Sequence, residues 1–445
     1  MIGQFFKRWY GDFSWEELKK FLLLAVIFAC IIGVTWCFKP LKDAIFCATV
    51  GVKYQPSAKI ITLFLILGLV MLYSKLADRF SKDKMFYILC TLYGLATLVF
   101  YWLLQHPEIG LANPNICSDR LIGWFWYAFV ESFGSILVVT FWSFVADTTT
   151  PESAKRGYNI LAMGGQVGGI IGPWVATWAQ TVGSAVIVLG VAFVIFAIMG
   201  LVKLMMTTVN KSQLQGYETK APAAAEQHPG IWEGFKLLLT QPYLCAIFGV
   251  IAIFGIITTI FEFQFQVEAF KLTGTADAMA HYMGWFGVAV NGVTLLNLVL
   301  GIGNITRKLG LTVSLVLMPV LILLCVLVVY WAQDLSPVWS LRAMFGAMVL
   351  STSANYALGS PAKEQLYIPT SRDTKYKAKV WIEAFGHRSS RAAGSGINLL
   401  REFLPNSFML ASLLISVGLI GLWVWLAYYL GRTHQRAIKH DQIVC

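Results

Sequence analysis

Charged residues are scarce in this chain: Asp, Glu, Lys and Arg make up 13% of its 445 residues, whereas 57% are hydrophobic. A soluble domain of this length could not keep so much apolar surface out of water, so the composition excludes ordinary globular classes. The sequence also lacks a CxxC pair, a His-rich metal set and a Ser, His and Asp constellation. We therefore expect no metal, no cofactor and no enzymatic activity, and predict a polytopic helical membrane protein.

A cleavable signal peptide is also missing from the pattern. Residues 1–20 are polar and charged, and no small-residue cleavage site follows the apolar run at 21–36, so we expect the first span to be retained as an anchor. The eight Cys fall mostly inside apolar segments. They are expected to be small buried hydrophobic residues rather than disulfide partners.

Twelve apolar stretches are long enough to cross a bilayer, since a helix needs about 20 residues to do so. The first six are predicted at 21–42, 58–76, 85–104, 121–146, 160–180 and 182–206, and the second six at 243–265, 278–301, 311–331, 338–359, 380–400 and 408–430. The polar stretch between them has no apolar period and is typical of a linker. We predict an N-terminal six-helix bundle (1–206), a cytoplasmic linker (207–235), a C-terminal six-helix bundle (236–432) and a cytoplasmic tail (433–445).

The net charge of +11 resides in alternate loops. Lys and Arg crowd the loops at 75–84, 155–156 and 363–379, while the opposite loops at 105–118 and 332–336 are almost free of them. The positive-inside rule then predicts that both termini are cytoplasmic. A lipid bilayer explains this distribution, and we expect no nucleic-acid partner.

Weak internal similarity relates the two halves. WEELK at 15–19 recurs as WEGFK at 232–236, and the loop KLADRFSKDK at 75–84 has a shorter counterpart, NITRKLG, at 304–310. Both loops follow the second span of their half, as expected for parallel repeats. The first loop is similar to the G-x-L-x-D-R-x-G-R-K signature of the major facilitator superfamily. The resemblance implies a major-facilitator-like fold with two pseudo-symmetric halves.

Two glycine rows run through the fifth predicted span, with Gly164, Gly168 and Gly172 on one row and Gly165 and Gly169 on the next. A spacing of four places each row on one helical face, where small residues let helix backbones approach closely. We interpret them chiefly as a packing surface, with a hinge during transport as the alternative.

Charges inside a span are costly, by roughly 2.5 to 3.5 kcal/mol each, and so mark candidate pathway residues. Lys39 and Lys42 lie three apart, with Pro40 between them, and are candidate phosphate ligands. The alternative is that they extend to the headgroups, which suits Lys39 better than Lys42. Asp43 joins them as a candidate coupling or gating residue.

Two carboxylates interrupt apolar spans: Glu131 and Glu262. Each is a candidate for pairing with a Lys, carrying a coupling proton or reading a donor on the substrate, and a purely structural ion pair is the alternative. Asp147 lies nearer a span end and is a candidate gate residue. Arg388, Arg391 and Ser395 recur at three and four on one helical face, where guanidinium groups suit phosphate or carboxylate oxygens and Ser395 is a candidate substrate contact. The alternative is that the arginines extend to the headgroups or lie on a cytoplasmic extension of the helix.

Several stretches together resemble the non-mitochondrial nucleotide transporters, the ATP/ADP translocase family of chlamydiae, rickettsiae and plastids. They are FKPLKDAIF from Phe38, ESFGSILVVTFWSF from Glu131, the surroundings of Glu262, PAKEQLYIP from Pro361 and DTKYKAKVWIEAFGHRSSRAAGSG from Asp373. The resemblance implies a twelve-span carrier of intact nucleotides in a bacterial inner membrane or, less favoured, a plastid envelope. It also implies that Lys42, Glu131, Glu262 and Lys363 match charged positions that the family needs, and that Arg388 and Arg391 match its basic pair. Lys363 is therefore a further candidate phosphate ligand.

The chain departs from the ATP/ADP exchangers at two motifs. FKPLKD stands where they carry R-D-T-K-D, and Asn355-Tyr356-Ala357-Leu358-Gly359-Ser360 stands where they carry K-Y-x-L-F-D, before Lys363 and Glu364. Asn355 and Tyr356 are further candidate substrate contacts, and Glu364 is a candidate gate.

We therefore predict a monomeric carrier that imports nucleoside triphosphates (ATP, GTP, UTP or CTP) with protons by alternating access. An obligate exchanger of ATP and ADP with the same fold is the alternative, and a non-transporting membrane receptor is a more remote one.

Overall fold

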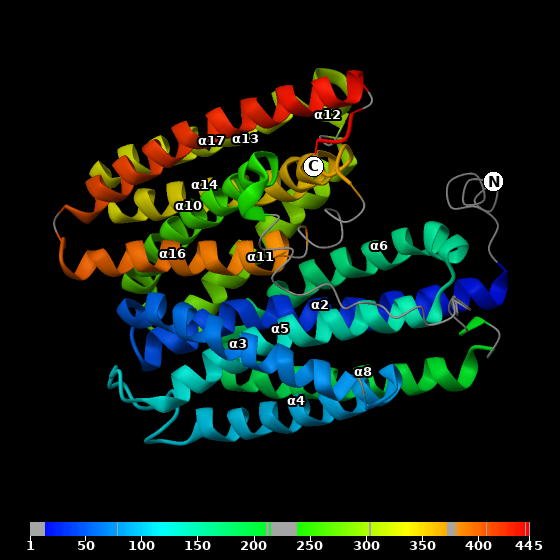
Figure 1. Ribbon diagram of the computed structural model, residues 1–445. Helices are drawn as coiled ribbons and strands as arrows, with labels where there is room; N and C mark the ends of the chain where they lie inside the picture. The colour runs from blue at the N-terminus through cyan, green and yellow to red at the C-terminus, as the bar shows by residue number, and fades with distance from the viewer. Residues whose placement is uncertain are drawn as a thin grey trace. The chain divides into compact units, whose positions relative to one another are not determined.

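The computed structural model describes residues 14–77, 79–210, 213–214, 238–301, 304–371, 379, 381–405, 407–440 and 442–444. These residues form helices and connecting turns without a β-strand (Figure 1), which confirms the all-α prediction. In a bilayer only a helix or a closed barrel satisfies all backbone polar groups. The repeat at 232–236, most of the predicted linker and the basic residues at 372–377 lie outside the described residues.

The helices of the first sequence half follow one another with short connections. They are α2 (Trp15–Thr49), α3 (Gln55–Ala77), α4 (Lys82–Gln105), α5 (Leu121–Thr148), α6 (Pro151–Ala176), the short α7 (Ala179–Val182) and α8 (Ser184–Thr208), with the 3-10 turn η1 (Val52–Tyr54) before α3. The reversal after α2 uses Gly51, whose φ of 106° favours glycine.

The second half begins with two long helices and then becomes less regular. Its elements are α10 (Pro242–Thr273), α11 (Ala276–Val299), α12 (Asn304–Leu309), α13 (Leu311–Trp331), η3 (Ala332–Asp334), α14 (Pro337–Ala354), η4 (Asn355–Gly359), α15 (Ser360–Leu366), η6 (Trp381–Gly386), α16 (His387–Leu399), η7 (Leu400–Glu402) and α17 (Phe408–Lys439). Here η4 and η6 are π-helical turns. Such turns are rare and frequently occur at functional sites.

Ten helices within the described ranges are long and apolar enough to span a membrane. They occupy ten of the twelve predicted spans. The other two, at 338–359 and 380–400, correspond to α14 with η4 and to η6 with α16. Both are helical, but their regular α-helices are short. The π-turn η4 follows the 18 residues of α14, and the π-turn η6 precedes the 13 residues of α16.

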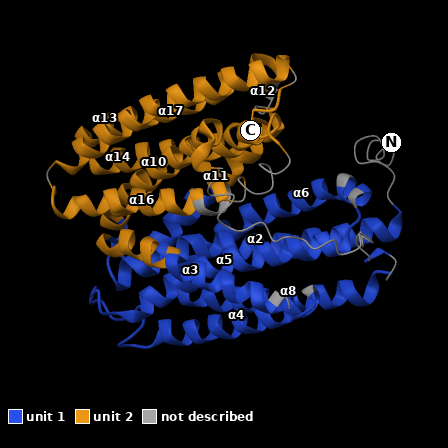
Figure 2. Ribbon diagram, in the orientation of Figure 1, with its two compact units in different colours: residues 1–52, 64–222, 273–288 blue, residues 53–63, 223–272, 289–445 orange. Residues whose placement is uncertain are grey.

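The chain forms two compact units (Figure 2). Unit 1 contains residues 1–52, 64–222 and 273–288, and unit 2 contains 53–63, 223–272 and 289–445. Each unit therefore includes one short segment from the other sequence half: the start of α3 belongs to unit 2, and the start of α11 belongs to unit 1.

Close packing of α6 on α2 confirms the packing interpretation of the first glycine row. An added Cβ at Gly164, Gly168 or Gly172 would press into the backbone carbonyls of Ala25, Ala29 and Gly33, respectively. At Gly165 it would meet only the Phe28 ring. Backbone cannot yield as a side chain can, so the row leaves no room for any side chain.

We expect Gly168→Ala to destabilise unit 1, because its methyl group would overlap the Ala29 carbonyl. Overpacking of this kind costs about 1–3 kcal/mol. The control is Gly190→Ala on α8, where nothing lies within 4 Å of the added Cβ. Thermal unfolding of detergent-solubilised protein should show a lower Tm for Gly168→Ala alone, and equal Tm values for the two variants would contradict the packing interpretation.

Unit 2 has an apolar core formed by α10, α13, α15 and α17, with Ile247, Leu315, Leu366 and Trp423 among its buried members. Helix α16 lies directly against α10. An added Cβ at Gly255 would overlap the Ser390 side chain, and one at Gly394 would lie 2.8 Å from the Ile256 carbonyl oxygen. This close approach fixes the orientation of α16 about its own axis, and with it the side of the helix on which the basic residues lie.

Candidate transport site

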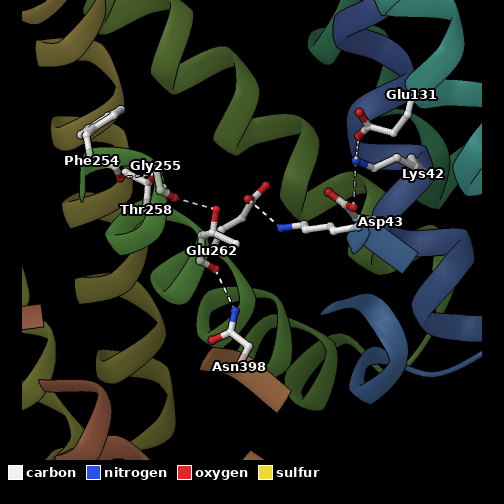
Figure 3. Close-up of polar contacts among 10 residues, drawn as sticks. Lys42, Asp43, Glu131, Phe254, Gly255, Thr258, Glu262 and Asn398 are labelled. Carbon is white, nitrogen blue, oxygen red and sulfur yellow. Dashed lines mark hydrogen bonds and ion pairs between the residues drawn. The ribbon is translucent and has the colours of Figure 1, made fainter. Parts of the chain in front are cut away.

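Lys42 lies between two carboxylates inside unit 1. Its Nζ points to both carboxylates (Figure 3), at 2.6 Å from Glu131 Oε1 and 3.5 Å from Asp43 Oδ1. The Lys42 and Asp43 side chains are each 7% exposed. Glu131 is more accessible, at 28%. The structure thus provides the lysine partner that was one of the alternatives for Glu131. The Lys42 ammonium group is therefore within 4 Å of both carboxylates.

Aromatic and backbone contacts hold this cluster in place. The Tyr127 ring lies 4.5 Å from Lys42 Nζ, a cation–π contact. Pro40 is inside α2 and cannot donate a backbone hydrogen bond, and Trp126 donates through Nε1 to the Leu41 carbonyl at 3.3 Å. The helix therefore stays anchored to α5 beside the lysine.

Lys39 has a different environment. Its side chain is on the exposed face of α2, and its Nζ lies 3.7 Å from the centroid of the Trp36 ring. It does not share the buried position of Lys42.

In unit 2 a second ion pair joins Lys59 of α3 to Glu262 of α10, with Nζ 2.8 Å from Oε2. The Lys59 side chain is 9% exposed and that of Glu262 is 26% exposed. The pair includes residues from both sequence halves, because the start of α3 belongs to unit 2.

Our sequence reasoning identified Glu262 but missed Lys59. The signal was present as a lone Lys in the run QPSAKIITLF, near the predicted end of a span. Such a lysine usually extends to the headgroups, and only its contact with Glu262 in the structure distinguishes the two cases.

Side-chain hydrogen bonds brace α10 around Glu262. Thr258 donates to the Phe254 carbonyl at 2.8 Å, and Asn398 of α16 donates to the Thr259 carbonyl at 3.1 Å (Figure 3). The Asn398 hydrogen bond links α16 to the turn of α10 that precedes Glu262.

Lys363 lies on α15, which directly follows the π-turn η4. It donates to Asn355 Oδ1 at 3.3 Å and sits 5.7 Å from the Phe254 ring centroid. Asn355 and Lys363 also line a small pocket together with Phe254, Ser314 and Trp423. The predicted substrate contact Asn355 and the predicted phosphate ligand Lys363 are thus neighbours.

The basic residues of α16 lie near Lys363. The charges of Lys363 and Arg391 both act on His387, and the charge of Arg391 also acts on Tyr356. Tyr356 is 45% exposed, and Arg391 and His387 are also exposed, whereas Arg388 is half-buried.

The remaining predicted site residues lie elsewhere in their units. Ser395 is fully buried on α16. Glu364 is exposed and pairs with Lys379 at 2.7 Å, and Asp147 is exposed at the C-terminal end of α5.

The fold defines the class of the protein. A crystal structure of a bacterial homologue of the iron transporter ferroportin matches 93% of this chain and 100% of its own, with 13% identity and a TM-score of 0.63. The nucleoside transporter NupG matches 93% of this chain and 98% of its own, with 12% identity and a TM-score of 0.61. These matches, together with the membrane-spanning helices, establish an integral membrane protein with a major-facilitator-like fold.

The family follows from the sequence. The model of the TLC ATP/ADP transporter family matches residues 6–434, so the chain belongs to this family and is a transporter rather than an enzyme. ADP,ATP carrier protein 3 of Rickettsia bellii is 23% identical over 95% of this chain and 96% of its own length. The chloroplastic ADP,ATP carrier protein 2 of Arabidopsis thaliana is 25% identical over 92% of this chain and 73% of its own.

Proposed function

We propose that this protein is a nucleotide carrier that exchanges nucleotides across the inner membrane of a bacterium by alternating access. The observation that carries the proposal is the pair of lysine–glutamate contacts inside apolar helices, Lys42 with Glu131 and Lys59 with Glu262. The similarity to proteins named ADP,ATP carriers supports nucleotides as the cargo. The loop charges favour cytoplasmic termini, and we propose a monomer.

Exchange fits the pairing of the carboxylates better than proton-coupled import does. Glu131 and Glu262 each lie within 3 Å of a lysine ammonium. Ion pairs of this kind stabilise the empty carrier in one conformation, and a bound polyanion weakens them by attracting the lysines. Only the loaded carrier then reorients, which makes transport an exchange.

Proton-coupled import of triphosphates is the second candidate. It is favoured by the departures from the exchanger motifs at 38–43 and 355–360, where a cation and a carboxylate of the exchangers are replaced. In that mechanism Glu131 or Glu262 leaves its lysine to carry the proton.

Purified protein in liposomes separates the two candidates. With ATP inside, labelled ATP outside is expected to enter rapidly, and entry into empty liposomes is expected to be at least about tenfold slower and insensitive to a protonophore. Equal entry into empty liposomes that a protonophore abolishes would contradict exchange and support import. No nucleotide entry under either condition would contradict both.

A further inference from the structure

The first three turns of α11 contact the ends of α6 and α8 within unit 1 (Figure 2). Asp277 Oδ1 accepts from the backbone N–H of Ser184 at 2.7 Å, and Nδ1 of His281 donates to the carbonyl of Thr177. An added Cβ at Gly284 would lie 2.8 Å from the Thr177 nitrogen. Residues 277, 281 and 284 are four and three apart, so they share one face of α11. We call these three residues, with Thr177 and Ser184, the α11 contact.

The partners of α11 in this contact are helix-terminal backbone groups. Thr177 is the C-cap of α6, and Ser184 is the first residue of α8. The carbonyl and the amide at such positions lack a partner inside their own helix. A carboxylate at a helix N-terminus and an imidazole N–H at a C-terminus also complement the helix dipoles. Asp277 and His281 are only half-buried, so water can replace them and the contact can open without leaving backbone groups unsatisfied.

The start of α3 is the equivalent segment of the first sequence half. Helices α3 and α11 are the second membrane-spanning helices of their halves, and each begins in the unit that contains most of the other half. At the start of α3 the contact is the ion pair between Lys59 and Glu262, and at the start of α11 it is the α11 contact. Parallel repeats place both starts on the same side of the membrane, which the loop charges favour as the outer side.

Helix α11 passes through the boundary between the two units. Residues 276–288 belong to unit 1 and residues 289–299 to unit 2. Neither a proline nor a π-turn interrupts α11, so a sharp kink in it is disfavoured. Alternating access rearranges such units as nearly rigid bodies, and an unkinked α11 then has to release its contacts with one of them. A contact made by two helix-terminal hydrogen bonds and a glycine is suited to such release.

We propose that the α11 contact is an outer gate, which ties α11 to α6 and α8 in this conformation and opens in every transport cycle. The inference rests on the proposed function, because alternating access requires an outer closure that forms and breaks. It adds Asp277, His281 and Gly284 as positioning residues. They act on transport by stabilising one conformation of the carrier rather than by touching the nucleotide.

Reversible cross-linking tests whether this gate opens. Two cysteine pairs span it: Ser184→Cys with Asp277→Cys, and Thr177→Cys with His281→Cys. Each purified pair is treated with a short bifunctional methanethiosulfonate, and intact-mass spectrometry measures the cross-linked fraction. One half of each sample is then reduced, and both halves are placed in liposomes that contain ATP. We expect the cross-linked half to take up labelled ATP at least about tenfold more slowly than the reduced half.

A third pair, Thr91→Cys with Met199→Cys, is the matched control. The Thr91 hydroxyl lies 3.8 Å from the Met199 sulfur, and the two residues join α4 to α8 inside one sequence half and one unit. Cross-linking this pair is therefore expected to leave uptake within about twofold of the reduced sample. All pairs share one background, in which Ser replaces Cys445 and the two exposed cysteines of the described residues, Cys117 and Cys245.

Each outcome has a defined meaning. Unchanged uptake after cross-linking of either gate pair would show that the α11 contact stays closed during transport, and would overturn the inference. Failure of both gate pairs to cross-link, or equal inhibition through the control pair, would refute it as well. Absence of uptake in the unsubstituted protein would instead refute the proposed function.

Discussion

Replacing Lys42 by Gln is expected to reduce nucleotide uptake on the order of 100-fold, equivalent to about 2.7 kcal/mol. The variant removes the ammonium group that lies 2.6 Å from Glu131 and 3.5 Å from the 7%-exposed side chain of Asp43. Breaking a buried ion pair by removing one partner is strongly destabilising, by about 3–5 kcal/mol, because it leaves an uncompensated charge. We therefore expect the Tm to fall together with the uptake rate.

A double-mutant cycle separates this pairing from a general effect of substitution. Lys42→Gln with Glu131→Gln removes one cation and one anion, so we expect its Tm to lie above that of Lys42→Gln alone. Uptake in the double variant is expected to remain low, because the ion pair that stabilises one conformation of the empty carrier is absent. If the two substitutions lower the Tm additively, the 2.6 Å contact does not couple them and the interpretation of the Lys42 cluster is wrong.

The second large effect is expected at Lys59. Lys59→Gln and Glu262→Gln should each reduce uptake at least about tenfold, because each leaves one charge of a largely buried pair inside apolar helices. The reversed pair, Lys59→Glu with Glu262→Lys, keeps the attraction and is expected to recover part of the lost Tm and uptake. Lys271→Gln serves again as the matched control, since its ion pair with Glu268 is exposed.

The reversed pair decides whether the contact matters in the membrane. A reversed variant that is no better than the worse single variant in both Tm and uptake would show that the two positions act independently. Full uptake by Lys59→Gln would remove Lys59 from the transport mechanism altogether.

Much of the fold is predictable from the sequence because the bilayer imposes simple rules. Ten of the twelve apolar stretches are span-length helices, since each has enough apolar residues to shield its own backbone. The glycine row at 164, 168 and 172 predicts a close helix contact, and the structure identifies α2 as its partner. Period and composition alone do not name that partner.

The irregular parts of the site could not be predicted in this way. The π-turns at 355–359 and 381–386 depend on tertiary packing, and no local pattern in NYALG or WIEAFG predicts them. The charge of Lys42 and Glu131 is evident in the sequence, but their 2.6 Å contact depends on α2 packing against α5. Ser395 shares a helical spacing with Arg391 yet is buried, because α16 packs closely on α10 through Gly394.

Charged side chains within the helices are expected to recognise the phosphates of a nucleotide during transport. Competition against labelled ATP uptake, in liposomes that contain the purified protein, measures this recognition. We expect unlabelled ATP and ADP to inhibit strongly, AMP to inhibit weakly and adenosine not to inhibit at all. Inhibition by adenosine as strong as that by ATP would contradict it.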